Sequence, residues 1–66
     1  MEPKIIGRKL RELRGNRKII DVARDLGISK SAIAMYEAGA RVPKDSVKVK
    51  LAKYFDVSVE SIFFTE

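Results

Sequence analysis

The side chains that could do chemistry in this 66-residue chain are lysines, arginines, serines and carboxylates, because histidine and cysteine are absent. Fourteen basic residues stand against nine acidic ones, which gives a net charge of +5 at pH 7. A serine nucleophile needs an activating base, and Ser29 and Ser58 are better explained as helix caps. Asp21 and Asp25 are better explained as a solvated face than as a cation site. We therefore expect no enzyme, no metal site and no cofactor.

Six of the fourteen basic residues flank residues 19–38 or open the second helix within them. They are Arg14, Arg17, Lys18, Lys30, Arg41 and Lys44. Residues 55–66, in contrast, contain three acids and no base. An excess of positive charge on one side favours a polyanionic partner such as nucleic acid, although solubility is the simpler explanation of charge alone.

The second helix of the chain is predicted over residues 19–26. Val22 and Leu26 are apolar at helical spacing, and the small Ala23 allows a second helix to cross closely. Gly27 should end the helix, because glycine enters the left-handed conformation without steric cost.

The third helix of the chain is predicted over about residues 30–38. Ser29 offers a side-chain oxygen to the free N–H groups at its start. Ile33 and Tyr36 form an apolar stripe at i and i+3. A turn as short as this one holds two helices roughly perpendicular, so residues 19–38 have the pattern of a helix-turn-helix.

The remaining three helices are predicted over about residues 4–14, 44–55 and 59–64, which makes them the first, fourth and fifth of the chain. In the first of them, Ile6, Leu10 and Leu13 form an apolar stripe. In the last, Val59, Ile62 and Phe63 form another, at i, i+3 and i+4. Pro43 suits the start of the fourth helix, because its missing N–H would have had no partner there. We predict one all-α domain of five helices over residues 1–66, without a stretch apolar enough to span a bilayer.

These features resemble the Cro and lambda-repressor family of DNA-binding domains, also called Xre-like. The resemblance runs from about Ile6 to Phe63, and its matching residues are Val22, Ala23, Leu26, Gly27, Ile28, Ile33, Tyr36, Glu37, Gly39, Arg41, Pro43, Leu51, Ala52, Lys53, Val57, Ser58, Val59, Ile62 and Phe63. It implies a compact lambda-repressor-like fold. The helix at residues 30–38 would then enter the major groove of double-stranded DNA.

The start of the second helix departs from the family pattern. Where the family usually has a capping Ser or Thr, this chain has Lys18, which has no acceptor. Asp21 would compensate through the helix dipole. Ile19 replaces a polar residue that often contacts phosphate, so that contact is either lost or moved to Arg17 or Lys18. Ile19 and Ile20 would pack on the first helix, or one of them would be exposed.

The resemblance places base-edge contacts at Lys30, Ser31 and Met35. The ammonium of Lys30 suits guanine O6 and N7, with phosphate or solvent as the alternative. Ser31 either bonds a base or only assists the helix start. Ala34 and Met35, which also point outward, could meet a thymine methyl, whereas Met35 could instead cover the core.

Phosphate contacts are expected at Arg17, Lys18, Arg41 and Lys44, with simple solvated charges as the alternative. The free N–H groups at three helix starts would add to them. In the family an arginine of the first helix commonly pairs with the glutamate that ends the third. This implies an Arg14–Glu37 pair that orients the third helix.

Proteins of this kind usually bind palindromic half-sites about 34 Å apart as two-fold dimers. We expect a homodimer interface at Ile62 and Phe64, unless Phe64 folds back on the first helix. The expected function is that of a sequence-specific transcriptional regulator, a repressor, because repression needs only occupancy of the operator. It would act in the cytoplasm, at the nucleoid of a prokaryotic cell or as a phage product. The alternative is a protein-interaction module or antitoxin with weak or no DNA binding of its own.

Overall fold

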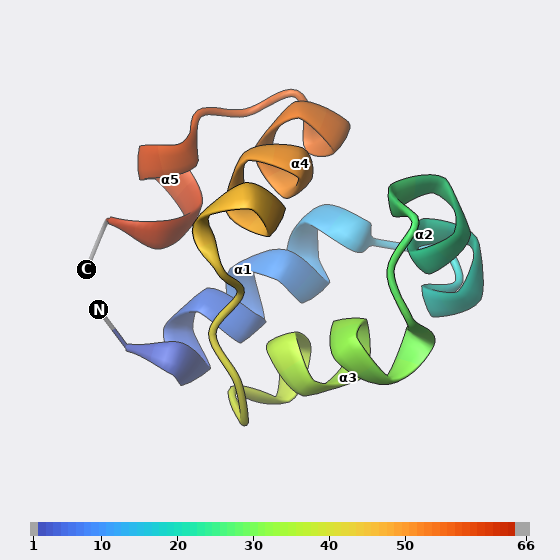
Figure 1. Cartoon of the computed structure of the whole chain (residues 1–66). Helices are drawn as coiled ribbons and strands as arrows, with labels where there is room; N and C mark the ends of the chain where they lie inside the picture. Colours follow the sequence, from blue (N-terminus) through green and yellow to red (C-terminus); the bar gives the residue numbers. More distant parts are fainter. Residues whose placement is uncertain (1, 65–66) are drawn as a thin grey trace.

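The computed structural model describes residues 2–64, and every helix or strand assigned in that range is an α-helix (Figure 1). The helices are α1 (Pro3–Arg14), α2 (Ile19–Leu26), α3 (Lys30–Ala38), α4 (Asp45–Phe55) and α5 (Val59–Phe63). Helix α3 packs on α1 and α2, whereas α5 packs on α4 and α1. In Figure 1, α1 crosses the middle of the molecule with α3 below it and α4 above. The predicted five-helix, all-α fold is confirmed.

The bounds of α2 and α3 are those predicted, and the other three helices differ by one residue at one end. Helix α1 begins at Pro3, which is tolerated there because the first N–H groups of a helix have no partner within it. The fourth helix, predicted over about residues 44–55, begins one residue later, at Asp45, with Lys44 as its N-cap residue. Pro43 lies in the preceding loop with its side chain fully buried. No helix within residues 2–64 is both long enough and apolar enough to cross a membrane.

The core lies where the helices cross, and it is built from the predicted apolar stripes. Its buried members are Ile6, Leu10, Val22, Ala23, Leu26, Ile33, Tyr36, Val47, Leu51, Ala52, Ile62 and Phe63. Full burial of one large aliphatic or aromatic side chain contributes about 1.5–3 kcal/mol relative to exposure. Because every helix supplies at least two of these residues, the core fixes α3 relative to α1 and α2.

Two glycines allow α1 to approach the last turn of α3 closely. A Cβ atom on Gly7 would lie 2.7 Å from the carbonyl oxygen of Tyr36, closer than real Cβ atoms come. Gly39 ends α3 with φ +75°, and a Cβ atom there would lie 2.9 Å from Cα of Lys4. The first half of α1 therefore lies directly against the C-terminal end of α3.

Candidate nucleic-acid interface

The turn between α2 and α3 is formed by the two residues that the sequence indicated. Gly27 is left-handed at φ 70°, and the N–H of Ile28 donates to the carbonyl of Ala23 at 3.0 Å. Ser29 Oγ accepts a hydrogen bond from the N–H of Ala32 at 3.0 Å. Both the glycine stop and the serine cap are confirmed, so the N-terminal end of α3 has a defined direction.

The face of α3 opposite the core carries the four residues predicted to contact bases. Ile33 and Tyr36 are buried, whereas Lys30, Ser31 and Ala34 are exposed. Met35 is 37% exposed and is therefore not a core residue. The outward face of α3 thus combines one cation, one hydroxyl and two apolar side chains.

The start of α2 shows how the departure from the family pattern is accommodated. Lys18 is the N-cap residue, and its side chain makes no capping hydrogen bond. Asp21 lies in the first turn, where the helix dipole favours a negative charge, and it also pairs with Arg24 at 3.2 Å. Ile19 packs against the core, whereas Ile20 is 57% exposed. One of the two isoleucines is therefore presented to the surface.

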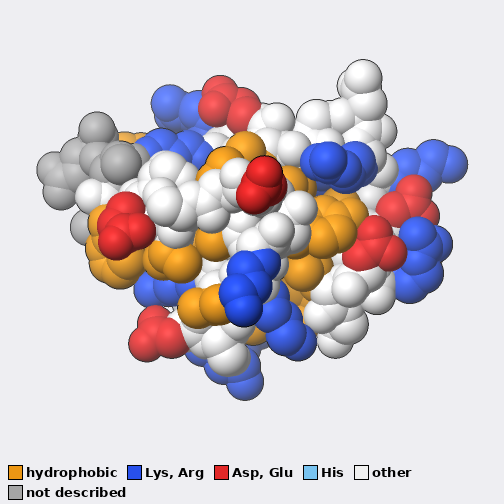
Figure 2. All heavy atoms as spheres, turned by 90° about the horizontal axis from the view of Figure 1, so that it is seen from above, with side chains coloured by type: hydrophobic (Ala, Val, Ile, Leu, Met, Phe, Trp, Pro, Cys, Tyr) orange, Lys and Arg blue, Asp and Glu red, His pale blue; other side chains and the backbone are white. Residues whose placement is uncertain are grey.

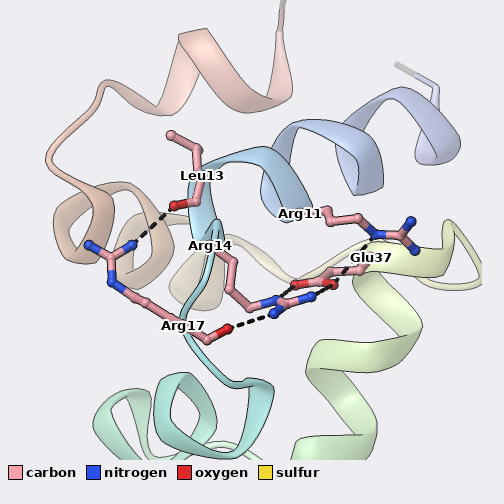
Figure 3. A network of polar contacts seen from close by, with 5 residues as sticks. All are labelled: Arg11, Leu13, Arg14, Arg17 and Glu37. Carbon is pink, nitrogen blue, oxygen red and sulfur yellow. Dashed lines mark hydrogen bonds and ion pairs between the residues drawn. The ribbon is translucent and has the colours of Figure 1, made fainter.

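Arg14 and Glu37 form the predicted pair, which joins α1 to the end of α3 (Figure 3). Arg14 Nε donates to Glu37 Oε2 at 2.6 Å, and Nη2 donates to Oε1 at 3.0 Å. The side chain of Glu37 is 6% exposed, and that of Arg14 is 18% exposed. The hydrogen bond to Glu37 raises the pKa of Arg14 above its ordinary value. Two parallel bonds between a buried carboxylate and a guanidinium fix the orientation of α3 on α1.

Arginine contacts with main-chain oxygens hold the connection between α1 and α2, and sequence reasoning missed them. Arg14 Nη1 donates to the carbonyl of Arg17 at 2.6 Å, while Arg17 Nη1 donates to the carbonyl of Leu13 at 3.0 Å. The Arg17 guanidinium also lies over the rings of Tyr54 and Phe55, at 5.8 and 5.6 Å. The phosphate contact predicted for Arg17 stays a prediction.

The other residues predicted to contact phosphates are exposed at the edges of the same motif. Lys18 and Lys44 are the N-cap residues of α2 and α4, and Arg41 lies in the loop after α3. Among residues 2–64, none of these three side chains or Lys30 has an acidic partner. Positive charge therefore adjoins the free N–H groups at the starts of α2, α3 and α4, which themselves attract anions.

The two residues predicted at a dimer interface occupy different environments. Ile62 is 1% exposed, so its side chain belongs to the core of this chain and its assignment to an interface is wrong. Phe64 is 60% exposed and does not fold back on α1; Lys48 Nζ lies 5.7 Å from its ring centre. Figure 2, which views the α4–α5 side, shows acidic, basic and apolar side chains interspersed.

The model of the helix-turn-helix family matches residues 8–62, and these residues include α2, the turn and α3. The chain belongs to this family, in its Xre/lambda-repressor-like form. Over 46 residues, 70% of either chain, it is 39% identical to an uncharacterized HTH-type transcriptional regulator of Methanocaldococcus jannaschii. No solved structure matches the chain significantly.

Membership of this family indicates what class of function the described geometry serves. Helix-turn-helix domains of this type serve DNA-binding transcription regulation and are generally not enzymes. In such a motif the second helix lies in the major groove while the first crosses the backbone. In this chain the second helix of the motif is α3, and its outward face is exposed.

Proposed function

We propose that this helix-turn-helix protein binds double-stranded DNA sequence-specifically and represses transcription as a homodimer on a palindromic operator. The observation that supports the proposal most directly is the outward face of α3, where Lys30, Ser31, Ala34 and Met35 are all exposed. A face that is not needed for the core, on a helix fixed by the core and by the Arg14–Glu37 pair, is available to read base edges.

Each residue of this face has a chemically defined role in the proposal. Lys30 donates to O6 and N7 of a guanine, the acceptors that mark this base in the major groove. Ser31 donates to or accepts from a neighbouring base, since a hydroxyl can do either. Ala34 and Met35 contact a thymine methyl group through apolar surface.

Phosphate contacts would position this helix without reading sequence. We assign them to Lys18, Arg41 and Lys44, which are exposed and have no acidic partner among residues 2–64. Arg17 would join them, because its exposed guanidinium has N–H groups beyond the one that donates to Leu13. The proposed partner is genomic DNA, so the proposed site of action is the cytoplasm of a prokaryotic cell.

The dimer contact is proposed at Phe64, because a phenylalanine left 60% exposed gains from burial against a second copy. Lys48 Nζ lies over one face of the ring, 5.7 Å from its centre, and the rest of the side chain accounts for this exposure. Two copies joined in this way would present two α3 helices to half-sites about 34 Å apart.

Selection of bound duplexes from a random pool tests the proposal. We expect enrichment of one palindromic sequence, with binding that weakens steeply as salt rises, on a slope near 0.9 per phosphate neutralised. Recovery of unselected sequences, or no complex at low salt, would contradict sequence-specific binding.

A protein-interaction module or antitoxin is the second candidate, and the surface of α2 favours it. Ile19 is packed against the core where the family often has a polar phosphate contact, and Ile20 is 57% exposed beside it. An exposed isoleucine at this position suits a protein partner better than it suits phosphate. Binding to a protein partner that is insensitive to salt, with no selected duplex, would support this candidate.

A further inference from the structure

Helix α1 carries a basic stripe that has no part in the contacts assigned so far. Lys4, Arg8 and Arg11 stand at i, i+4 and i+7, and all three are exposed. Each residue of an α-helix turns by about 100°, so these three side chains leave α1 within about 60° of one another. The stripe is therefore one continuous edge of α1.

This edge lies next to the end of α3. Gly7 stands between Lys4 and Arg8 in the sequence, and it faces the carbonyls of Tyr36 and Glu37 at short range. The stem of Lys4 lies against Gly39, since a Cβ atom on Gly39 would be 2.9 Å from both Cα and Cγ of Lys4. Lys4, the first residue of the stripe, therefore lies against the end of α3, at a point only two residues before Arg41 in the sequence.

Two members of the stripe have charges that no acid in the described chain neutralises. Within residues 2–64, neither Lys4 nor Arg8 takes part in an ion pair or a side-chain hydrogen bond. Arg11 differs, because its Nε lies 3.9 Å from Glu37 Oε1. Lys4 and Arg8 are therefore the two cations that an outside anion would meet.

We propose that Lys4 and Arg8 bind DNA phosphates and extend the backbone contact of Arg41 onto α1. This inference rests on the proposed function, because the proposed phosphate contact of Arg41 is what brings a DNA strand close to the C-terminal end of α3. The two residues are about 6 Å apart along the helix axis. One strand of duplex DNA carries a charge about every 3.4 Å of its axis, so two cations at this spacing match nearby phosphates of one strand.

A purely structural role for Lys4 predicts a different outcome. A cation beside the C-terminal end of a helix stabilises that helix through the helix dipole. In that case its removal lowers the thermal midpoint and leaves the salt dependence of DNA binding unchanged. Phosphate binding changes the salt dependence and leaves the base preference as it was.

The test compares the double variant Lys4→Gln/Arg8→Gln with Lys50→Gln/Lys53→Gln, which loses the same net charge. Lys50 and Lys53 are exposed on α4, which Figure 1 shows above α1 while α3 lies below it. Lys50 Nζ also donates to the carbonyl of Leu26 at 3.5 Å, so the unfolding of this control variant is measured as well. Binding of a selected operator duplex is measured over a range of salt concentrations, with thermal unfolding as the check on folding. A third variant, Lys4→Arg/Arg8→Lys, keeps both charges.

The slope of the logarithm of the binding constant against the logarithm of the salt concentration should be smaller by about 1.8 for Lys4→Gln/Arg8→Gln than for the wild type. A fourfold rise in salt should therefore weaken binding of this variant about 12-fold less than binding of the wild type. The α4 variant and the charge-conserving variant should keep the wild-type slope. Equal slopes for the wild type and Lys4→Gln/Arg8→Gln would overturn this inference and leave the proposed function intact. Failure of the wild type to bind any duplex would refute both.

Discussion

Replacement of Arg14 by Met should destabilise the fold strongly, because it leaves a buried carboxylate without its guanidinium. Glu37 is 6% exposed and receives two hydrogen bonds from Arg14. Removal of one partner of a buried pair costs about 3–5 kcal/mol. Arg11 stays near Glu37 at 3.9 Å, so we take the lower end of this range, about 3 kcal/mol.

Thermal unfolding followed by circular dichroism measures this cost. In a domain of this size, 1 kcal/mol shifts the midpoint by about 4–8 °C, so Arg14→Met should lower it by about 12–24 °C. Arg11→Met is the matched control: its side chain is 67% exposed, and an exposed ion pair contributes about 0–1 kcal/mol.

The double variant Arg14→Met/Glu37→Leu separates the unpaired charge from lost packing. With no carboxylate left to bury, it should recover most of the stability that Arg14→Met loses. The reasoning is refuted if Arg14→Met and Arg11→Met lower the midpoint equally, because Glu37 would then not depend on Arg14.

Three further predictions follow from packing, titration and exposure. Gly7→Ala should lower the thermal midpoint, because the new Cβ atom would crowd the carbonyls of Tyr36 and Glu37 at a cost of about 1–3 kcal/mol. Helix propensity alone predicts the opposite, so a higher midpoint would contradict the close approach of α1 to α3. The hydrogen bond from Tyr54 to Asp25, at 2.7 Å, raises the pKa of Tyr54. Its stabilising contribution is therefore present below the ordinary tyrosine pKa and lost as pH rises through the raised pKa. Asp25→Asn should lower that pKa in an ultraviolet titration of tyrosinate, and an unchanged curve would count against the contact. Phe64→Ser should weaken self-association at least tenfold in sedimentation equilibrium, whereas an unaltered dimer would exclude Phe64 from the interface.

The sequence predicted the features that depend on one residue and its near neighbours. Gly27 and Ser29 could be assigned because a left-handed stop and an oxygen cap are properties of those residue types. The apolar stripes predicted the core for the same reason, and Ile62 was part of such a stripe. Its assignment to the interface went against that pattern, and the structure shows that the pattern was right.

Two kinds of feature were not predictable: side-chain bonds to main-chain acceptors, and close packing between segments that are distant in the sequence. Arg14 bonds the carbonyl of Arg17, and every residue has a carbonyl, so no side-chain pattern marks this acceptor. The need for Gly7 likewise comes from α3, which lies about thirty residues further along the chain. Pro43 lies just before α4, as its preference for a helix start indicated, but its full burial depends on packing that its residue type does not reveal.

The central claim is that the outward face of α3 reads bases, and Lys30→Ala tests it most directly. Binding of the selected operator and of all its single base-pair variants is measured for the wild type, Lys30→Ala and Arg41→Ala. Lys30→Ala should lose preference at one base pair and about 1–3 kcal/mol on the operator, whereas Arg41→Ala should weaken binding to every duplex evenly. An unchanged preference at every base pair in Lys30→Ala would contradict the account.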